Sequence, residues 1–164
     1  MPAVIQDGAD KLLDRSWIAA HIPHQGSMCL LDRVREHDAE RIVCCTSSHQ
    51  SADNPLRAAG RLGAATGIEY AAQAMAVHCA LLVDAPAGEA RQATQGYIAA
   101  IRGVTSHVDR LDDLPGELEV LAERQSAMPG GAMYAFRLMA DGRELQSGRV
   151  TLMFETFTPP GEEK

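Results

Sequence analysis

The chain has 164 residues, of which 46% are hydrophobic and 23% charged, and its formal net charge is −7. These values predict a globular protein with a core of its own and exclude a disordered or fibrous chain. A nucleic-acid-binding protein would need a basic face, so the negative charge argues against nucleic acid as a partner. We expect a single domain over residues 1–158 and a flexible C-terminal tail over 159–164, where a Pro-Pro-Gly run precedes charged residues.

The cysteines and the apolar stretches indicate the compartment. The four cysteines form no CxxC pair, and the residues before Trp17 lack a basic region followed by an apolar one. We therefore expect reduced, buried thiols in a cytoplasmic protein without a secretory signal. The longest apolar stretch, residues 64–83, contains Glu69, Gln73 and His78, so we expect no membrane span.

The N-terminal third reads as one short helix followed by two strands. Apolar residues recur at helical spacing over 10–22, and Pro23 ends that pattern. Residues 28–35 and 40–48 are predicted strands joined by a turn at 37–39. A loop rich in Ser, Asp, Asn, Pro and Gly follows over 49–61, and long ordered loops often carry functional residues.

Residues 64–83 give the strongest helix signal in the chain. Ile68, Ala72, Met75, Cys79 and Leu82 recur at alternating intervals of four and three residues, and alanines cover most of the remaining surface. A helix that is apolar nearly all round is a buried helix, so we expect this stripe in the core. Glu69 and Gln73 lie four residues apart and therefore share one face.

The rest of the chain is predicted to be a loop at 84–90 and then strands. They cover residues 95–104, 117–124, 133–140 and 144–154, with turns at Pro129-Gly130-Gly131 and Asp141-Gly142. One buried helix followed by antiparallel strands indicates an α+β fold. We expect a hot-dog fold, in which an antiparallel curved sheet is wrapped around one long central helix.

Three stretches resemble the 3-hydroxyacyl-acyl-carrier-protein dehydratases of the hot-dog superfamily. Residues 22–34 (IPHQGSMCLLDRV) are similar to the family's N-terminal Leu-Pro-His segment, and 67–74 (GIEYAAQA) to the start of its central helix. Residues 96–101 (GYIAAI) and 114–118 (LPGEL) are similar to its later strands and the turn between them. The loop variant between Asn54 and Glu69 resembles most the divergent dehydratase-like subunits of aryl-polyene and related pigment pathways.

The resemblance implies a hydro-lyase that dehydrates a 3-hydroxyacyl thioester carried by acyl carrier protein. Such a dehydratase requires no cofactor. The resemblance also implies a homodimer or a heterodimer with a second hot-dog subunit. Two alternatives stay open at this point. One is an acyl thioesterase on the same fold, and the other is a non-catalytic subunit that supports an active hot-dog partner.

Three residues are the catalytic candidates. A carboxylate on an apolar helix is costly unless it is paired or protonated, and burial would raise the pKa of Glu69, which suits a general acid. His49, at the start of the loop where the family keeps its base, is the expected general base, although it lies twenty residues before Glu69. His24 is the competing histidine. In the family it resembles a structural residue, and we expect it not to line the tunnel shared by His49 and Glu69.

Other residues are candidates for binding. Gln73 is expected to orient the Glu69 carboxyl, and backbone N–H groups of the helix start are expected to bind the thioester carbonyl, at Ala64, Ala65, Thr66 and Gly67. The alternative for the glycines here is that they only permit close packing. Arg57 and Arg61 are candidate contacts to the carrier protein or to its phosphopantetheine phosphate. No His, Cys, Asp or Glu spacing indicates a metal site.

Overall fold

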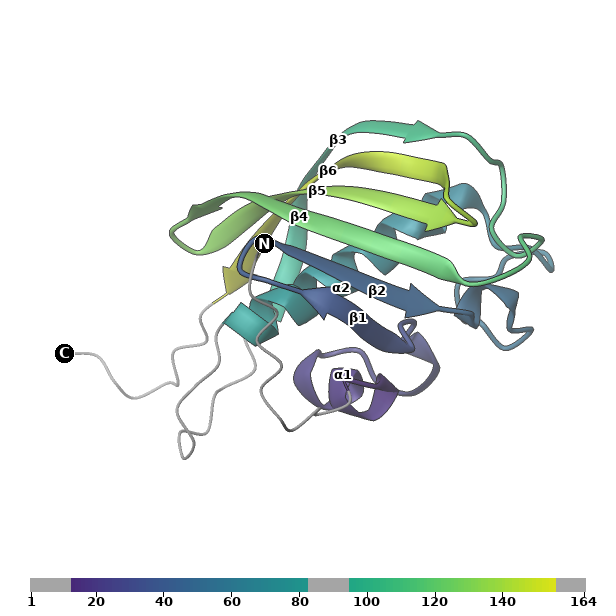
Figure 1. Ribbon diagram of the computed structural model, residues 1–164, viewed down its shortest axis with the longest axis horizontal. Helices are drawn as coiled ribbons and strands as arrows, with labels where there is room; N and C mark the ends of the chain where they lie inside the picture. Colours follow the sequence, from purple (N-terminus) through teal and green to yellow (C-terminus); the bar gives the residue numbers. More distant parts are fainter. Residues whose placement is uncertain (1–12, 83–94, 156–164) are drawn as a thin grey trace.

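Six antiparallel strands form one curved sheet, and one long helix packs against a single face of it (Figure 1). The computed structural model describes residues 13–82 and 95–155. The strand order is β1-β2-β4-β5-β6-β3. In chain order the elements are α1 (Arg15–His21), η1 (Gly26–Met28), β1 (Arg33–His37), β2 (Arg41–Thr46), η2 (Ser48–Gln50), η3 (Ala64–Thr66), α2 (Gly67–Leu82), β3 (Gln95–Ser106), β4 (Leu118–Met128), β5 (Gly131–Ala140) and β6 (Arg143–Glu155). This architecture confirms the expected hot-dog fold.

Helix α2 buries a different stripe from the predicted one. Its buried side chains face the sheet and the N-terminal segment: Tyr70, Ala71, Gln73, Ala74, Met75, Val77 and His78. Of the predicted stripe only Met75 is fully buried, whereas Ile68, Ala72 and Cys79 are half-buried. The prediction of the stripe is wrong because a helix rich in alanine on all sides carries little information about its rotation. A single sheet then covers only part of its circumference.

The predicted strand over 28–35 is wrong in its first half. Residues Gly26–Met28 form a turn of 3₁₀-helix, and the strand β1 begins at Arg33. Leu30 explains the difference, because its N–H and C=O bond to side chains of α2 and β2. The other predicted strands and the central helix are confirmed with small shifts of their ends. The predicted loop at 84–90 and the tail at 159–164 lie outside the described residues.

One edge of the sheet exposes large apolar side chains. Strand β3 forms the edge opposite β1 and pairs with β6. It exposes three large apolar side chains, Tyr97 (50%), Ile101 (44%) and Val104 (38%). An open edge strand with apolar side chains is a surface at which another strand can pair.

The cysteines and the lengths of the helices complete the description of the fold. Cys29, Cys44 and Cys45 are buried, Cys79 is half-buried, and all four are free thiols. Among the helices that the structure describes, none is long and apolar enough to cross a membrane.

Candidate functional site

His24 and Glu69 meet where the segment after α1 lies against the first turn of α2. His24 follows Pro23, which prevents α1 from continuing, and Asp14 caps the start of that helix through the Trp17 N–H at 3.0 Å. The Nε2 atom of His24 lies 3.1 Å from Oε1 of Glu69. Their side chains are 26% and 32% exposed. The pair is therefore half-buried and open to a small molecule from one side.

Gln73 lies one helical turn after Glu69 and fixes the surroundings of the pair. Its Oε1 accepts the Leu30 N–H at 2.9 Å, and its Nε2 donates to the Met28 carbonyl at 2.7 Å. The same Nε2 lies 3.4 Å from Glu69 Oε1. Because Leu30 N–H must meet an oxygen, the amide orientation is determined, and its N–H side faces the carboxyl group.

The environment lowers the pKa of Glu69 below its ordinary value. The hydrogen bond from His24 is the largest cause, and it outweighs the opposing effect of burial, with a smaller contribution from Gln73. Burial acts in the predicted direction, but the hydrogen bond from His24 is the larger effect, so the net pKa is lowered and the expected raised pKa is wrong. At neutral pH the Glu69 side chain is therefore a carboxylate, which accepts hydrogen bonds and cannot donate one.

His49 occupies a different environment. Its ring is fully buried, Nε2 lies 3.2 Å from the Leu114 carbonyl oxygen, and Nδ1 has no partner. Burial lowers the pKa of His49. No hydrogen bond or ion pair joins His49 to Glu69 within residues 13–82 and 95–155. Its role as the base stays a prediction, and so does the expectation that His24 does not line the tunnel, although the structure places His24 in contact with Glu69.

A buried polar cluster that the sequence reasoning missed lies beside this site. The Tyr70 hydroxyl, on the residue after Glu69, lies 2.9 Å from Ser48 Oγ and 3.0 Å from Asn54 Nδ2. Ser48 Oγ and Thr46 Oγ1 both bond the Leu30 carbonyl, at 2.6 and 2.5 Å. Tyrosine in an otherwise apolar helix was a usable signal, because a buried hydroxyl needs a partner.

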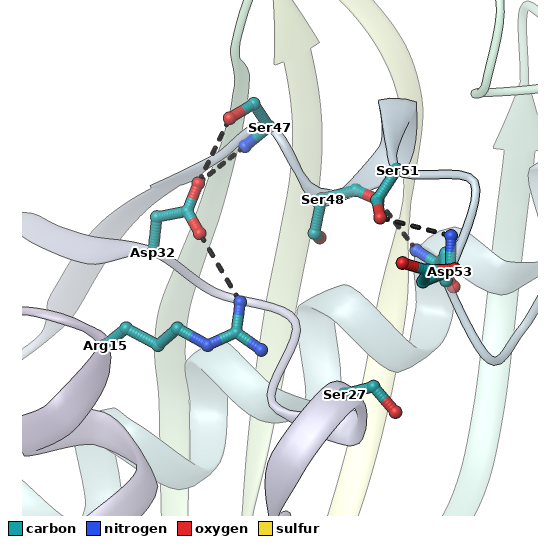
Figure 2. A pocket seen from close by; sticks show the side chains of 8 residues that line it. Arg15, Ser27, Asp32, Ser47, Ser48, Ser51 and Asp53 are labelled. Carbon is teal, nitrogen blue, oxygen red and sulfur yellow. Dashed lines mark hydrogen bonds and ion pairs between the residues drawn. The ribbon is translucent and has the colours of Figure 1, made fainter.

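A pocket of about 350 Å³ opens beside the cluster (Figure 2). Asp32 crosses part of it, accepting from the backbone and hydroxyl of Ser47 and lying 3.9 Å from Arg15. The residues that line it all have polar side chains: Arg15, Ser27, Asp32, Ser47, Ser48, Ser51, Asp53 and Asn54. Ser48 and Asn54 thus belong both to the pocket wall and to the Tyr70 cluster.

The start of α2 is tightly packed. The N–H of Ala64 bonds the Asp109 carbonyl at 3.0 Å, and that of Thr66 bonds Gly63 at 3.1 Å. A Cβ on Gly67 would overlap Gln146 Oε1, so close packing accounts for this glycine. Three of the four amides expected to bind a carbonyl are already bonded, those of Ala64, Thr66 and Gly67. Carbonyl binding by Ala64, Ala65, Thr66 and Gly67 stays a prediction.

The two arginines expected at the carrier protein differ. The Arg57 guanidinium turns into its own loop and donates to the carbonyls of Ser51 (2.7 Å), Gly60 (3.2 Å) and Gln50 (3.3 Å). Arg61 is exposed. Contact with a carrier protein stays a prediction for both. Among the described residues no group of three or more His, Cys, Asp or Glu is placed to hold a metal ion.

A curved antiparallel sheet and one central helix define a hot-dog protein, and the first turn of its helix carries a Glu in contact with a His. Residues 16–159 match the model of the ApeP-like family, described as ApeP dehydratase. The chain belongs to the ApeP-like dehydratase family. This confirms the resemblance found in the sequence, including the variant loop. No curated protein matches the chain by sequence.

Solved structures show the same fold. The dehydratase heterocomplex ApeI:P from Xenorhabdus doucetiae matches with a TM-score of 0.73 and 21% identity, over 85% of this chain and 91% of that chain. Thioesterase superfamily member 2 from zebra fish matches with a TM-score of 0.56 and 12% identity, over 85% and 94%. A mutant of thioesterase PA1618 from Pseudomonas aeruginosa matches with a TM-score of 0.52 and 15% identity, over 74% and 79%.

Proposed function

We propose that the chain is a hydro-lyase that dehydrates a 3-hydroxyacyl thioester carried by acyl carrier protein, with His24 and Glu69 as its acid–base pair. The observation that carries the proposal is the 3.1 Å contact between His24 Nε2 and Glu69 Oε1 in a member of a dehydratase family. Both side chains are partly exposed, so a substrate can reach them. This replaces His49 by His24 in the predicted mechanism.

The reaction needs one proton acceptor and one proton donor. The acceptor takes the proton from C2, the C2=C3 double bond forms, and the C3–O bond breaks as the donor protonates the departing hydroxyl. The pair ends with the same number of protons, moved from one residue to the other. Polarisation of the thioester carbonyl by donors near the start of α2 makes the C2 proton acidic enough to be removed.

The state of Glu69 supports one assignment of these roles. Because its pKa is lowered chiefly by His24, Glu69 is a carboxylate at neutral pH, and His24 is the donor in their contact. In the proposed assignment Glu69 accepts the C2 proton and ends as the carboxylic acid. His24 donates to the hydroxyl, a step that requires it to start as the imidazolium and leaves it as the neutral imidazole. This reverses the roles predicted from the sequence, which made Glu69 the acid.

Turnover is tested with a 3-hydroxyacyl carrier protein and mass analysis for loss of one water. His24→Gln and Glu69→Gln should each lower turnover by about 10²–10⁴-fold. His49→Gln is the matched control, since it makes the same substitution at a buried histidine that does not contact Glu69, and its turnover should stay near wild type. Loss of turnover in His49→Gln alone would return the catalytic role to His49.

The roles are separated with an acyl thioester that lacks the 3-hydroxyl group. Exchange of its C2 hydrogen with deuterated water needs the proton acceptor but no proton donor. Glu69→Gln should abolish this exchange, whereas His24→Gln should retain it. The opposite pattern would assign the acceptor role to His24.

A second hot-dog subunit is the partner we propose for the exposed surface of β3. Tyr97, Ile101 and Val104 on this edge, and the half-buried face of α2 with Ile68 and Ala72, leave apolar surface uncovered in the single chain. The related ApeI:P structure is a heterocomplex by its description. The turnover assay is therefore run on the chain alone and with a second hot-dog dehydratase subunit. Activity only in the mixture would favour the supporting-subunit alternative.

The thioesterase alternative is favoured by one observation, the match of several hot-dog thioesterases to this fold. The same mass analysis separates it from dehydration. A thioesterase releases the 3-hydroxy acid and leaves the carrier protein with a free thiol, whereas a dehydratase keeps the acyl group attached.

A further inference from the structure

We propose that Tyr70 is a positioning residue that sets the contact between His24 and Glu69, acting through Ser48 and Leu30. The inference rests on the proposed function of the His24–Glu69 pair. Tyr70 and Leu30 are fully buried, and neither side chain contacts a substrate in the proposed reaction. Their effect on chemistry is therefore indirect.

The hydroxyl of Tyr70 has a defined direction. Asn54 Nδ2 is a donor, and it lies 3.0 Å from the Tyr70 oxygen, which therefore accepts from it. The Tyr70 proton is left for Ser48 Oγ at 2.9 Å, and Ser48 in turn donates to the Leu30 carbonyl at 2.6 Å. The bonds run in one direction, from Asn54 through Tyr70 and Ser48 to Leu30.

Leu30 is held from two sides by side chains. Its carbonyl is bonded by Ser48 and Thr46, and its N–H is bonded by Gln73, which also holds the Met28 carbonyl and contacts Glu69. The segment that carries His24 is thereby fixed against α2, which carries Glu69. Because residues 28–32 lie outside the strands, these side-chain bonds take the place of a β-ladder in holding the segment.

Loss of the Tyr70 hydroxyl should loosen this segment. Ser48 Oγ keeps only Thr46 Oγ1 as a donor, and Asn54 Nδ2 keeps only the Ser48 carbonyl as an acceptor. We expect the Leu30 carbonyl to be held less firmly as a result. His24 then contacts Glu69 less closely, and because that contact is the main cause of the lowered pKa of Glu69, the pKa should rise. Small displacements of catalytic groups have large effects on rate.

The test compares Tyr70→Phe with Tyr134→Phe. Tyr134 is also fully buried against α2, and its hydroxyl lies 2.7 Å from His78 Nδ1 and 3.4 Å from Cys79 Sγ, away from the proposed site. Each substitution removes one buried hydroxyl beside the same helix, and similar losses of thermal stability are expected. Only Tyr70→Phe should lower kcat, by about 10–100-fold, with KM nearly unchanged and the acidic limb of the pH profile moved to higher pH.

A second readout does not depend on turnover. The pKa of the Glu69 carboxyl, followed by carbon NMR, should rise in Tyr70→Phe and stay at its wild-type value in Tyr134→Phe. If wild-type protein shows no dehydration, the proposed function fails, and this titration still decides the positioning role.

Ser48→Ala breaks the same chain of bonds while keeping the Tyr70 side chain, and it should act in the same direction. It serves as the second variant if Tyr70→Phe does not fold. Equal effects of Tyr70→Phe and Tyr134→Phe on kcat and on the Glu69 titration would overturn the proposal, as would an unchanged Glu69 titration in both Tyr70→Phe and Ser48→Ala.

Discussion

Replacing Gly67 with alanine tests whether close packing, and not backbone freedom, requires glycine at the start of α2. The backbone at Gly67 is right-handed helical, with φ −58° and ψ −27°, so alanine can adopt it. An added Cβ would overlap Gln146 Oε1 and lie 2.9 Å from Leu138 Cδ2. The conformational effect and the packing effect of this substitution therefore oppose each other.

The packing effect is the larger. Alanine in place of glycine stabilises by up to about 1 kcal/mol where its conformation is allowed. Displacing Gln146 breaks its hydrogen bonds to Ala64 O (2.9 Å) and Ser106 Oγ (2.8 Å), which contribute roughly 2 kcal/mol together. Overpacking against Leu138 adds at least about 1 kcal/mol. The net loss in the free energy of unfolding should be about 2 kcal/mol, or roughly 4–8 °C in Tm.

Urea and thermal unfolding followed by circular dichroism measure this difference. Gly63→Ala is the matched control, because no atom lies within 4 Å of a Cβ there, and it should be neutral or slightly stabilising. In a Gln146→Ala background these two hydrogen bonds are already absent, so the cost of Gly67→Ala should shrink by about 2 kcal/mol. A Gly67→Ala protein as stable as wild type would refute the packing argument.

Three further predictions concern the rest of the molecule. Burial lowers the folded-state pKa of His49 and His78, so the unfolded chain binds more protons than the folded one. The free energy of unfolding should therefore fall as the pH drops below about 6.5. His49→Gln should weaken this pH dependence in urea titrations. Burial raises the pKa of the thiols, so Ellman's reagent should react slowly with the native protein. After unfolding, the reagent should detect four thiols: Cys29, Cys44, Cys45 and Cys79. Ile101→Lys on the exposed edge of β3 should leave the fold intact. It should weaken the proposed assembly with a second hot-dog subunit, measured by analytical ultracentrifugation.

The fold was predictable because its strongest signals are local. Alternating strands, tight turns and one alanine-rich helix occur in an order that few architectures accommodate. The rotation of α2 was not predictable, because alanines surround it on all sides and apolar spacing alone placed Ile68 and Cys79 in the core. The start of β1 was also missed, because side chains far away in sequence bond Leu30 in place of a neighbouring strand.

The site was predictable only in part. Glu69 and Gln73 stand out as polar residues on an apolar helix, and the structure places them in contact. The partner of Glu69 was not predictable from spacing, because the contact with His24 joins segments 45 residues apart in sequence. The place of His49 at the start of the loop, where the resembled family keeps its base, favoured His49. In the structure that ring is buried beside the Leu114 carbonyl and does not bond Glu69.

The ionised state of Glu69 follows chiefly from His24, and one backbone group fixes the smaller contribution of Gln73. The Leu30 N–H occupies the oxygen of the Gln73 amide, so the amide presents its N–H side to Glu69, and His24 presents a second donor to the same carboxylate oxygen. Two donors favour the ionised carboxylate over the acid, and the partial burial of the Glu69 side chain does not reverse this lowering of its pKa. In the proposed reaction, the proton that leaves with the hydroxyl is therefore assigned to His24. The segment after α1 thus contributes the proposed acid, and it holds in place the amide that keeps the proposed base ionised.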